Sequence, residues 1–139
     1  DALIEVMQQN GSLRSPRVEA AFRRVPRHHF LPEVPLENAY GDAAIMVKRD
    51  EEGRWTSSSS QPSMMAIMLE QLDLRPGLRV LEIGAGSGYN AALMAELVGP
   101  GGSVISVDMV RLSRSAYPAI ARAAMVCTSG WGSVSRSSR

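Results

Sequence analysis

Apolar side chains recur every three or four residues in two stretches near the start of the chain, 2–9 and 16–25. This spacing places them on one face of a helix, so each stretch predicts a short amphipathic helix. Gly11 follows the first helix and Pro26 stops the second. The prolines spread over 24–42 then predict a largely irregular connection that runs over the surface.

The hydrophobic pattern is weaker in the next part of the chain. Residues 43–48 predict a short strand, and the charged run at 51–55 predicts a turn. A third helix is predicted over 62–72, because a proline at its first position costs little where the N–H has no partner. Ser60 or Gln61 would cap this helix.

From residue 78 onward the pattern changes to strand, helix, strand. Apolar runs at 78–84 and 103–108 flank a helical pattern at 90–99. Nearly continuous apolar strands are typical of parallel sheets covered on both faces, and the connection between two such strands is right-handed. The predicted fold class is therefore α/β, a doubly wound Rossmann-like sheet or its N-terminal half only, preceded by small helices.

The loop after the first of these strands, EIGAGSGYN, carries glycines at alternate positions. Glycine allows a sharp turn and lets a ligand approach main-chain atoms where a Cβ would collide. A dinucleotide fingerprint spaces its glycines G-x-G-x-x-G, so that pyrophosphate sits on the helix N-terminus. The spacing here is G-x-G-x-G with an acid two positions before the first glycine, which is typical of S-adenosylmethionine sites. The predicted cofactor contacts in this loop are Glu82, Gly84, Ala85, Gly86 and Gly88.

Asp108 ends the second strand, 20 residues after Gly88, and completes the predicted cofactor site. A carboxylate in this place accepts both hydroxyls of a ribose. The alternative is a glycine-rich turn followed by a surface aspartate. For Glu82 two roles stay open, since it could orient the loop through backbone N–H groups or contact the ligand itself.

Composition narrows the class of partner. The 139 residues are 45% hydrophobic and 21% charged, which suits one globular domain, and the net charge of +1 favours neither nucleic acid nor an anionic membrane. A small molecule or a peptide is the expected partner. The cytoplasm is the default location for three reasons. The chain has a single cysteine, it lacks an apolar stretch of roughly 20 residues, and it shows no secretory signal. The start at Asp1 suggests a fragment or a processed product.

Residues 14–109 resemble the protein-L-isoaspartate O-methyltransferase family, whose cofactor is S-adenosylmethionine. The resemblance rests on VLEIGAGSGYNAALMAELVG, on SSQPSMMAIMLEQLDLRPG before it, and on VPRHHFLP and the pair Ala39-Tyr40 earlier in the chain. The Ser-Gln-Pro segment is its most specific part. The resemblance implies methyl transfer to the free α-carboxylate of an isoaspartyl residue in a damaged protein or peptide. The ester then closes to a succinimide and reopens, partly as normal aspartate.

The run TSSSS at 56–60 has two interpretations. Composition alone favours a solvated loop with a helix cap. The resemblance instead implies that Ser60, with Ser59 as second choice, lies beside the reacting carboxylate. A carboxylate is ionised at neutral pH and needs no general base, so the serine would orient it through a hydrogen bond. A nucleophilic Ser60 activated by His28 or His29 is not expected, because no G-x-S-x-G motif surrounds it.

Two other groups of residues are interpreted structurally. His28 and His29 have no cysteine or carboxylate at metal-ligand spacing, so no metal site is predicted, and they are expected in a loop beside a buried Phe30. The methionines of the helix at 62–72 are expected to fill the core. These are Met64, Met65 and Met68.

The resemblance fades after Asp108. Residues 110–139 carry scattered arginines and serines, contain no apolar run predicted to extend the sheet, and look disordered at 128–139. The sequence therefore predicts a truncated or frame-shifted member of the family. Its expected parts are a helical and loop region at 1–55, the start of a methyltransferase domain at 56–109, and an atypical tail.

Two rival functions stay open at this point. One is a methyltransferase that acts on another peptide or on a small-molecule carboxylate. The other is a catalytically dead module that binds S-adenosylmethionine but has lost the acceptor site. The sequence leaves the oligomeric state open.

Overall fold

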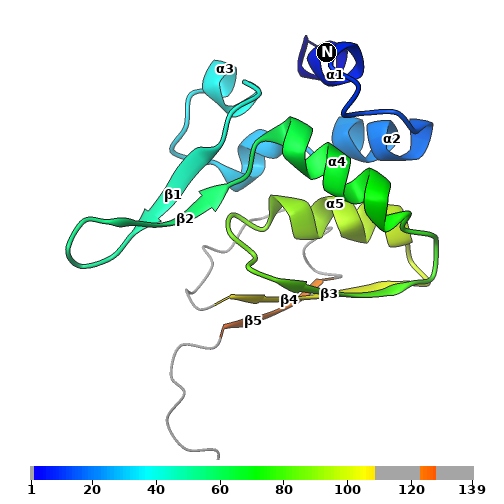
Figure 1. The fold of residues 1–139 in the computed structure, drawn as a ribbon. Coiled ribbons are helices and arrows are strands. Elements are labelled where there is room, and N and C mark those ends of the chain that lie inside the picture. The colour runs from blue at the N-terminus through cyan, green and yellow to red at the C-terminus, as the bar shows by residue number, and fades with distance from the viewer. Residues whose placement is uncertain (1, 109–122, 128–139) are drawn as a thin grey trace, which may run out of the picture.

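A computed structural model of the chain describes residues 2–108 and 123–127. A small parallel sheet forms one layer, and the helix α5 (Tyr89–Val98) lies directly on it (Figure 1). The other long helices stack on the same side of the sheet, so that α5 lies between them and the strands (Figure 1). This arrangement confirms the predicted α/β fold class.

The helices predicted from apolar spacing are confirmed. Ser15 caps the second of them, since its hydroxyl oxygen accepts a hydrogen bond from the Val18 N–H at 3.3 Å, with proline in the first turn as expected. Besides α5, these helices are α1 (Ala2–Gln9), α2 (Pro16–Arg24) and α4 (Pro62–Leu72).

The connection at 24–42 does not simply run over the surface, and that prediction was wrong. It contains a 3-10 turn, η1 (Arg27–Phe30), and a single helical turn, α3 (Leu36–Ala39). Both turns contribute buried side chains, and Phe30 is buried as predicted. Prolines interrupt the regular backbone hydrogen bonds of helices and strands. They do not prevent burial, because an irregular segment can still place apolar side chains in the core.

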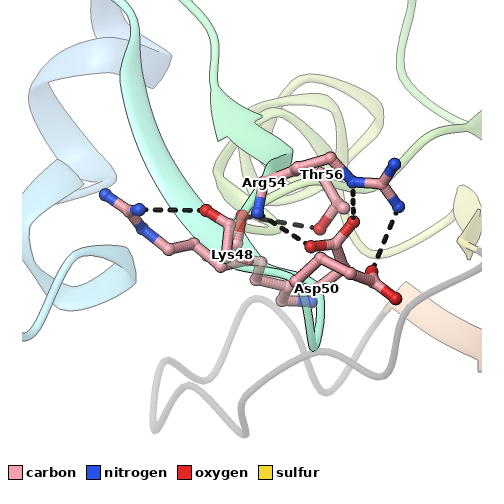
Figure 2. A network of polar contacts seen from close by, with 7 residues as sticks. Lys48, Asp50, Arg54 and Thr56 are labelled. Carbon is pink, nitrogen blue, oxygen red and sulfur yellow. Dashed lines mark hydrogen bonds and ion pairs between the residues drawn. The ribbon is translucent and has the colours of Figure 1, made fainter.

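The serine run belongs to a β-hairpin. β1 (Ile45–Arg49) confirms the strand predicted at 43–48, and it pairs antiparallel with β2 (Trp55–Ser59). The charged residues between the strands form the predicted turn, in which Asp50 accepts hydrogen bonds from the Arg54 N–H and guanidinium at 2.8 and 2.7 Å (Figure 2). Ser57, Ser58 and Ser59 are therefore held in an extended strand, and Ser60 follows directly after it.

The sheet has three parallel strands in the order β3-β4-β5, which are β3 (Arg79–Ile83), β4 (Ser103–Asp108) and β5 (Ala123–Cys127). The first two confirm the strands predicted around the glycine loop. The expectation that no strand follows Asp108 was wrong, because β5 pairs with β4 from Val104↔Ala123 to Asp108↔Cys127. Its five residues form an apolar run too short for the sequence pattern to distinguish from helix. The predicted disorder at 128–139 lies outside the described residues.

Tyr89 joins the N-terminal region to the sheet domain. It is the first residue of α5 and is buried. Its ring meets Phe22 of α2 edge-on at a centroid distance of 6.2 Å and Phe30 of η1 at 5.4 Å. Such aromatic contacts add to the burial of apolar area, so the N-terminal helices are fixed against the end of α5 that follows the glycine loop.

The two faces of the sheet differ in burial. Val104 and Ser106 of β4 are fully buried on the face that α5 covers. The alternate positions on β3 and β4 point to the other face, because successive side chains in a strand alternate. There Leu81, Ile83 and Ile105 are 64%, 84% and 41% exposed. Parallel sheets are ordinarily covered on both faces, but none of the described elements covers this face of the sheet.

Candidate functional site

The carboxyl ends of β3 and β4 meet at the glycine loop. The Gly84 N–H, directly after β3, donates to the Val107 carbonyl oxygen at 2.8 Å, which continues the ladder by one residue. The Gly86 N–H donates to the Asp108 carboxylate at 2.9 Å. The predicted loop and the predicted acid are therefore brought together at one edge of the sheet, where α/β folds bind their ligands.

The glycines of the loop adopt backbone conformations that other residues avoid. Gly84, Gly86 and Gly88 have φ values of +92°, +57° and +84°. A Cβ on Gly86 would lie 2.5 Å from the main-chain oxygen of Ser58, so the loop also fits tightly against β2. The sequence motif is explained by both requirements, since only glycine combines positive φ with so close an approach.

A cavity of about 300 Å³ lies between the serine run and the glycine loop. Six of the predicted site residues line it: Ser59, Ser60, Glu82, Gly84, Ala85 and Gly86. Two predicted residues, Gly88 and Asp108, do not line it. They support its wall, since Gly88 precedes α5 and Asp108 accepts the Gly86 hydrogen bond.

The two serines of the predicted acceptor site differ in exposure. Ser60 is exposed, whereas Ser59 is 2% exposed and its Oγ has no hydrogen-bond partner among the described residues. Apolar side chains of α4 form another side of the same cavity, including Met65, Met68 and Leu72. The cavity thus combines hydroxyl groups, open main chain and an apolar wall.

Glu82 is anchored by two side chains that the sequence analysis missed. Asn90 donates to one of its carboxylate oxygens at 2.8 Å, and the Ser106 hydroxyl donates to the other. Ser106 is the register partner of Glu82 on β4, and its place as a polar residue within an apolar strand was the signal that could have found it. The backbone N–H of Gly86 is bound by Asp108 and not by Glu82.

Burial raises the pKa of the Glu82 carboxyl above its usual range. Hydrogen bonds from Ser106 and Asn90 oppose this rise, whereas the negative charge of Asp108 adds to it. A carboxyl in this position is therefore less readily ionised than an exposed glutamate.

Asp42 caps α4, although the sequence predicted a cap from Ser60 or Gln61. Gln61 occupies the N-cap position but makes no side-chain capping bond. The Asp42 carboxylate instead accepts hydrogen bonds from the Ser63 N–H at 2.8 Å, the Ser63 hydroxyl at 2.7 Å and the Gln61 amide at 3.1 Å. Burial alone would raise the pKa of Asp42, yet these hydrogen bonds and the charge of Arg27 lower it.

His28 contacts Tyr40, and the prediction for the methionines holds only in part. Among residues 2–108 and 123–127, no cluster of His, Cys, Asp and Glu could hold a metal ion. His28 Nδ1 instead lies 2.9 Å from the Tyr40 hydroxyl. Of the predicted core methionines only Met65 is buried, and Met64 and Met68 are 51% and 38% exposed, so that part of the prediction was wrong.

Comparison with known proteins decides the family. A family model described as protein-L-isoaspartate(D-aspartate) O-methyltransferase matches residues 1–128. The chain belongs to this family. The match runs past the 14–109 region on which the sequence resemblance rested.

Curated relatives in the family agree with this membership. The chain is 46% identical over 110 residues to a protein-L-isoaspartate O-methyltransferase of Methanopyrus kandleri, covering 79% of this chain and 46% of the relative. It is 45% identical over 98 residues to one from Thermotoga maritima, covering 70% of this chain and 30% of the relative. The chain therefore spans about half the length, or less, of these relatives.

A solved structure supports the fold of the family. A chain titled protein-L-isoaspartate O-methyltransferase superimposes with a TM-score of 0.76 at 36% identity, over 91% of this chain and 41% of that one. Within the described residues, no helix combines the length and the apolar character needed to cross a bilayer.

Proposed function

We propose that the chain carries the cofactor site and part of the acceptor site of an S-adenosylmethionine-dependent methyltransferase that acts on L-isoaspartyl residues of damaged proteins or peptides. The observation that carries this proposal is the shared cavity, which has the glycine loop on one side and the serine run on the other. A cofactor and an acceptor bound there would be in contact. The names of the relatives support the same activity.

The residues around the glycine loop fit this cofactor. Gly84 leaves the main chain open where a Cβ would stand, Gly86 lets the loop lie against Ser58, and Asp108 at the end of β4 offers a carboxylate for a ribose. Glu82, Ala85 and Gly88 complete the proposed set. S-adenosylmethionine supplies an electrophilic methyl group on a sulfonium sulfur when it is bound.

The proposed role of the serines is orientation. A carboxylate acceptor is ionised near neutral pH, so the site needs no base to activate it. Ser60, exposed on the cavity, would donate a hydrogen bond to one carboxylate oxygen and hold the other in line with the methyl group. Ser59 would be the second donor, and the apolar side chains of α4 would limit the access of water.

Calorimetric titration with S-adenosylhomocysteine tests the cofactor site. Asp108→Ala is expected to weaken binding by about 1–3 kcal/mol, as for the loss of a charged hydrogen-bond partner. Glu5→Ala, at an exposed position on α1, is the matched control and should bind like the unaltered chain. Equal affinities of all three chains would place the cofactor elsewhere. Methylation of an isoaspartyl peptide, with the aspartyl peptide as control, then tests the acceptor.

The open face of the sheet favours a second candidate, a module that binds the cofactor without transferring the methyl group. Leu81, Ile83 and Ile105 are exposed there, where a parallel sheet is ordinarily covered. Stoichiometric binding of S-adenosylhomocysteine without methylation of the peptide would support this candidate. We also propose a cytoplasmic location and no nucleic-acid partner, which suit the single cysteine and the net charge of +1.

A further inference from the structure

The Arg27 guanidinium is buried beside the serine run. The side chain is 0% exposed, its Nε donates to the Ala39 carbonyl oxygen at 2.9 Å, and its Nη2 donates to the Ser60 carbonyl oxygen at 3.0 Å. The guanidinium carbon also lies 5.1 Å from the centroid of the Tyr89 ring. One side chain thus connects η1, the end of α3, the start of α5 and the turn between β2 and α4.

Stability alone does not explain a charge in this place. Burying a cation is unfavourable unless an anion pairs with it closely, and an apolar side chain of similar volume is often as stable. Among the described residues the hydrogen bonds of Arg27 go to two carbonyl oxygens and not to a carboxylate, and its Nη1 is buried without a hydrogen-bond partner. Burial lowers its pKa, although Tyr89, Asp42 and Tyr40 act in the opposite direction.

The turn that Arg27 binds is also held from its other side. Asp42 accepts hydrogen bonds from Gln61 and Ser63, the first and third residues after Ser60. The Ser60 carbonyl is therefore bound by Arg27, and the chain that follows is bound by Asp42. The Ser60 side chain remains exposed on the cavity. Main-chain fixation of this kind sets the direction in which a short side chain projects from the turn.

We propose that Arg27 is a positioning residue for the acceptor carboxylate, because its hydrogen bond to the Ser60 carbonyl fixes the direction of the Ser60 hydroxyl. This inference rests on the proposed function. The planar fork of arginine donors reaches two carbonyl groups in fixed directions, which a lysine ammonium does not reproduce. Arg27 does not touch the acceptor itself and acts only through Ser60.

Two binding measurements on the full chain test the inference, one with S-adenosylhomocysteine and one with an isoaspartyl peptide. Arg27→Lys and Arg27→Met are the variants, and Val98→Ala is the control. Val98 is buried at the end of α5 away from the glycine loop, so the control loses packing without touching the turn. Urea unfolding establishes that each chain is folded under the binding conditions.

Both Arg27 variants are expected to bind the peptide about tenfold more weakly or worse, while the affinity for S-adenosylhomocysteine stays within about twofold. Arg27→Lys should lose less than Arg27→Met, and Val98→Ala should change neither affinity beyond about twofold. Unchanged peptide binding in folded Arg27→Lys and Arg27→Met, or equal loss of both ligands, would overturn the inference. If Arg27→Met does not fold, Arg27→Lys alone decides.

The same experiment separates this inference from the proposed function. An unaltered chain that binds S-adenosylhomocysteine but no isoaspartyl peptide overturns the proposed acceptor, and the role of Arg27 with it. If the unaltered chain binds both S-adenosylhomocysteine and the peptide, and the Arg27 variants bind both with unchanged affinity, only the role of Arg27 is overturned.

Discussion

The main-chain N–H of Gly86 donates a hydrogen bond to the carboxylate of Asp108, with 2.9 Å between nitrogen and oxygen. The two residues come from different strand ends, and the bond closes the glycine loop onto the end of β4. The hydrogen bond therefore holds the loop without a ligand. Under the proposed function, a cofactor bound to Asp108 would contact the same carboxylate that holds the loop. Preorganisation of this kind reduces the entropy lost on binding.

Gly86→Ala is expected to destabilise the chain by about 2–4 kcal/mol, because a positive φ and a collision with the Ser58 oxygen act together. Gly77→Ala is the matched control, since Gly77 has a φ of +86° but no atom within 4 Å of its built Cβ. That control should lose only about 1 kcal/mol. Urea unfolding measures the free energy of unfolding of both variants. Equal losses of stability in Gly86→Ala and Gly77→Ala would mean that the contact with Ser58 has no energetic effect.

Asp42→Asn is expected to lower the free energy of unfolding by about 1–2 kcal/mol at neutral pH, since the carboxylate accepts three hydrogen bonds. Because folding lowers the pKa of Asp42, its contribution is fully present above the unfolded pKa of about 4 and is lost as the pH falls through the lower folded pKa. The difference between the two chains should therefore vanish in acid. Unfolding curves at several pH values measure it, with the exposed Glu37→Gln as control. A difference that does not change with pH would contradict the prediction.

Glu82→Gln should show the opposite dependence on pH. Folding raises the pKa of Glu82, so the folded chain binds the proton more tightly and the free energy of unfolding falls as the pH rises from about 4 through the folded pKa. The amide does not ionise, so the variant should gain stability relative to the unaltered chain over that range. Parallel profiles for the two chains would show that burial does not penalise this carboxylate.

Ser59→Ala and Ser63→Ala form a pair with opposite expected effects. The Ser59 Oγ is buried with no hydrogen-bond partner among the described residues, so its removal should leave stability unchanged or raise it by about 1 kcal/mol. The Ser63 Oγ donates to Asp42 and accepts from Asn10 at 2.7 and 2.9 Å, and its removal should lower stability by about 1–2 kcal/mol. Thermal unfolding compares the pair. A loss in Ser59→Ala as large as in Ser63→Ala would imply an ordered partner at Ser59.

The glycine loop and the acid that binds it were predictable because their signals are local. An apolar run closed by glycine marks β3, and an acid at the end of the next apolar run marks Asp108, so neighbouring residues carry the information. The strand β2 was not predictable in the same way. Its serines lack apolar alternation, and it exists because β1 pairs with it.

Arg27 illustrates why the contacts around the serine run were missed. A charged residue among prolines is expected on the surface, and its burial depends on carbonyl groups 12 and 33 positions away in the sequence. The partner of Ser63 is likewise Asp42, 21 residues earlier. No spacing rule in a single sequence predicts contacts of this length, because they arise only from the tertiary packing of η1, α3 and α4.

Because one face of the sheet is exposed, the affinity of the cavity for a ligand will depend on whether another molecule covers that face. Ile83 is 84% exposed on that face and directly precedes Gly84, the first glycine of the loop. A molecule that covers Leu81 and Ile83 therefore restrains the strand from which the loop emerges. Binding of a molecule to that face and binding of a ligand in the cavity are then linked equilibria. Each event changes the binding free energy of the other by the same amount. If a second copy of the chain covers that face, titrations at different protein concentrations will show a drift in the apparent dissociation constant of the ligand.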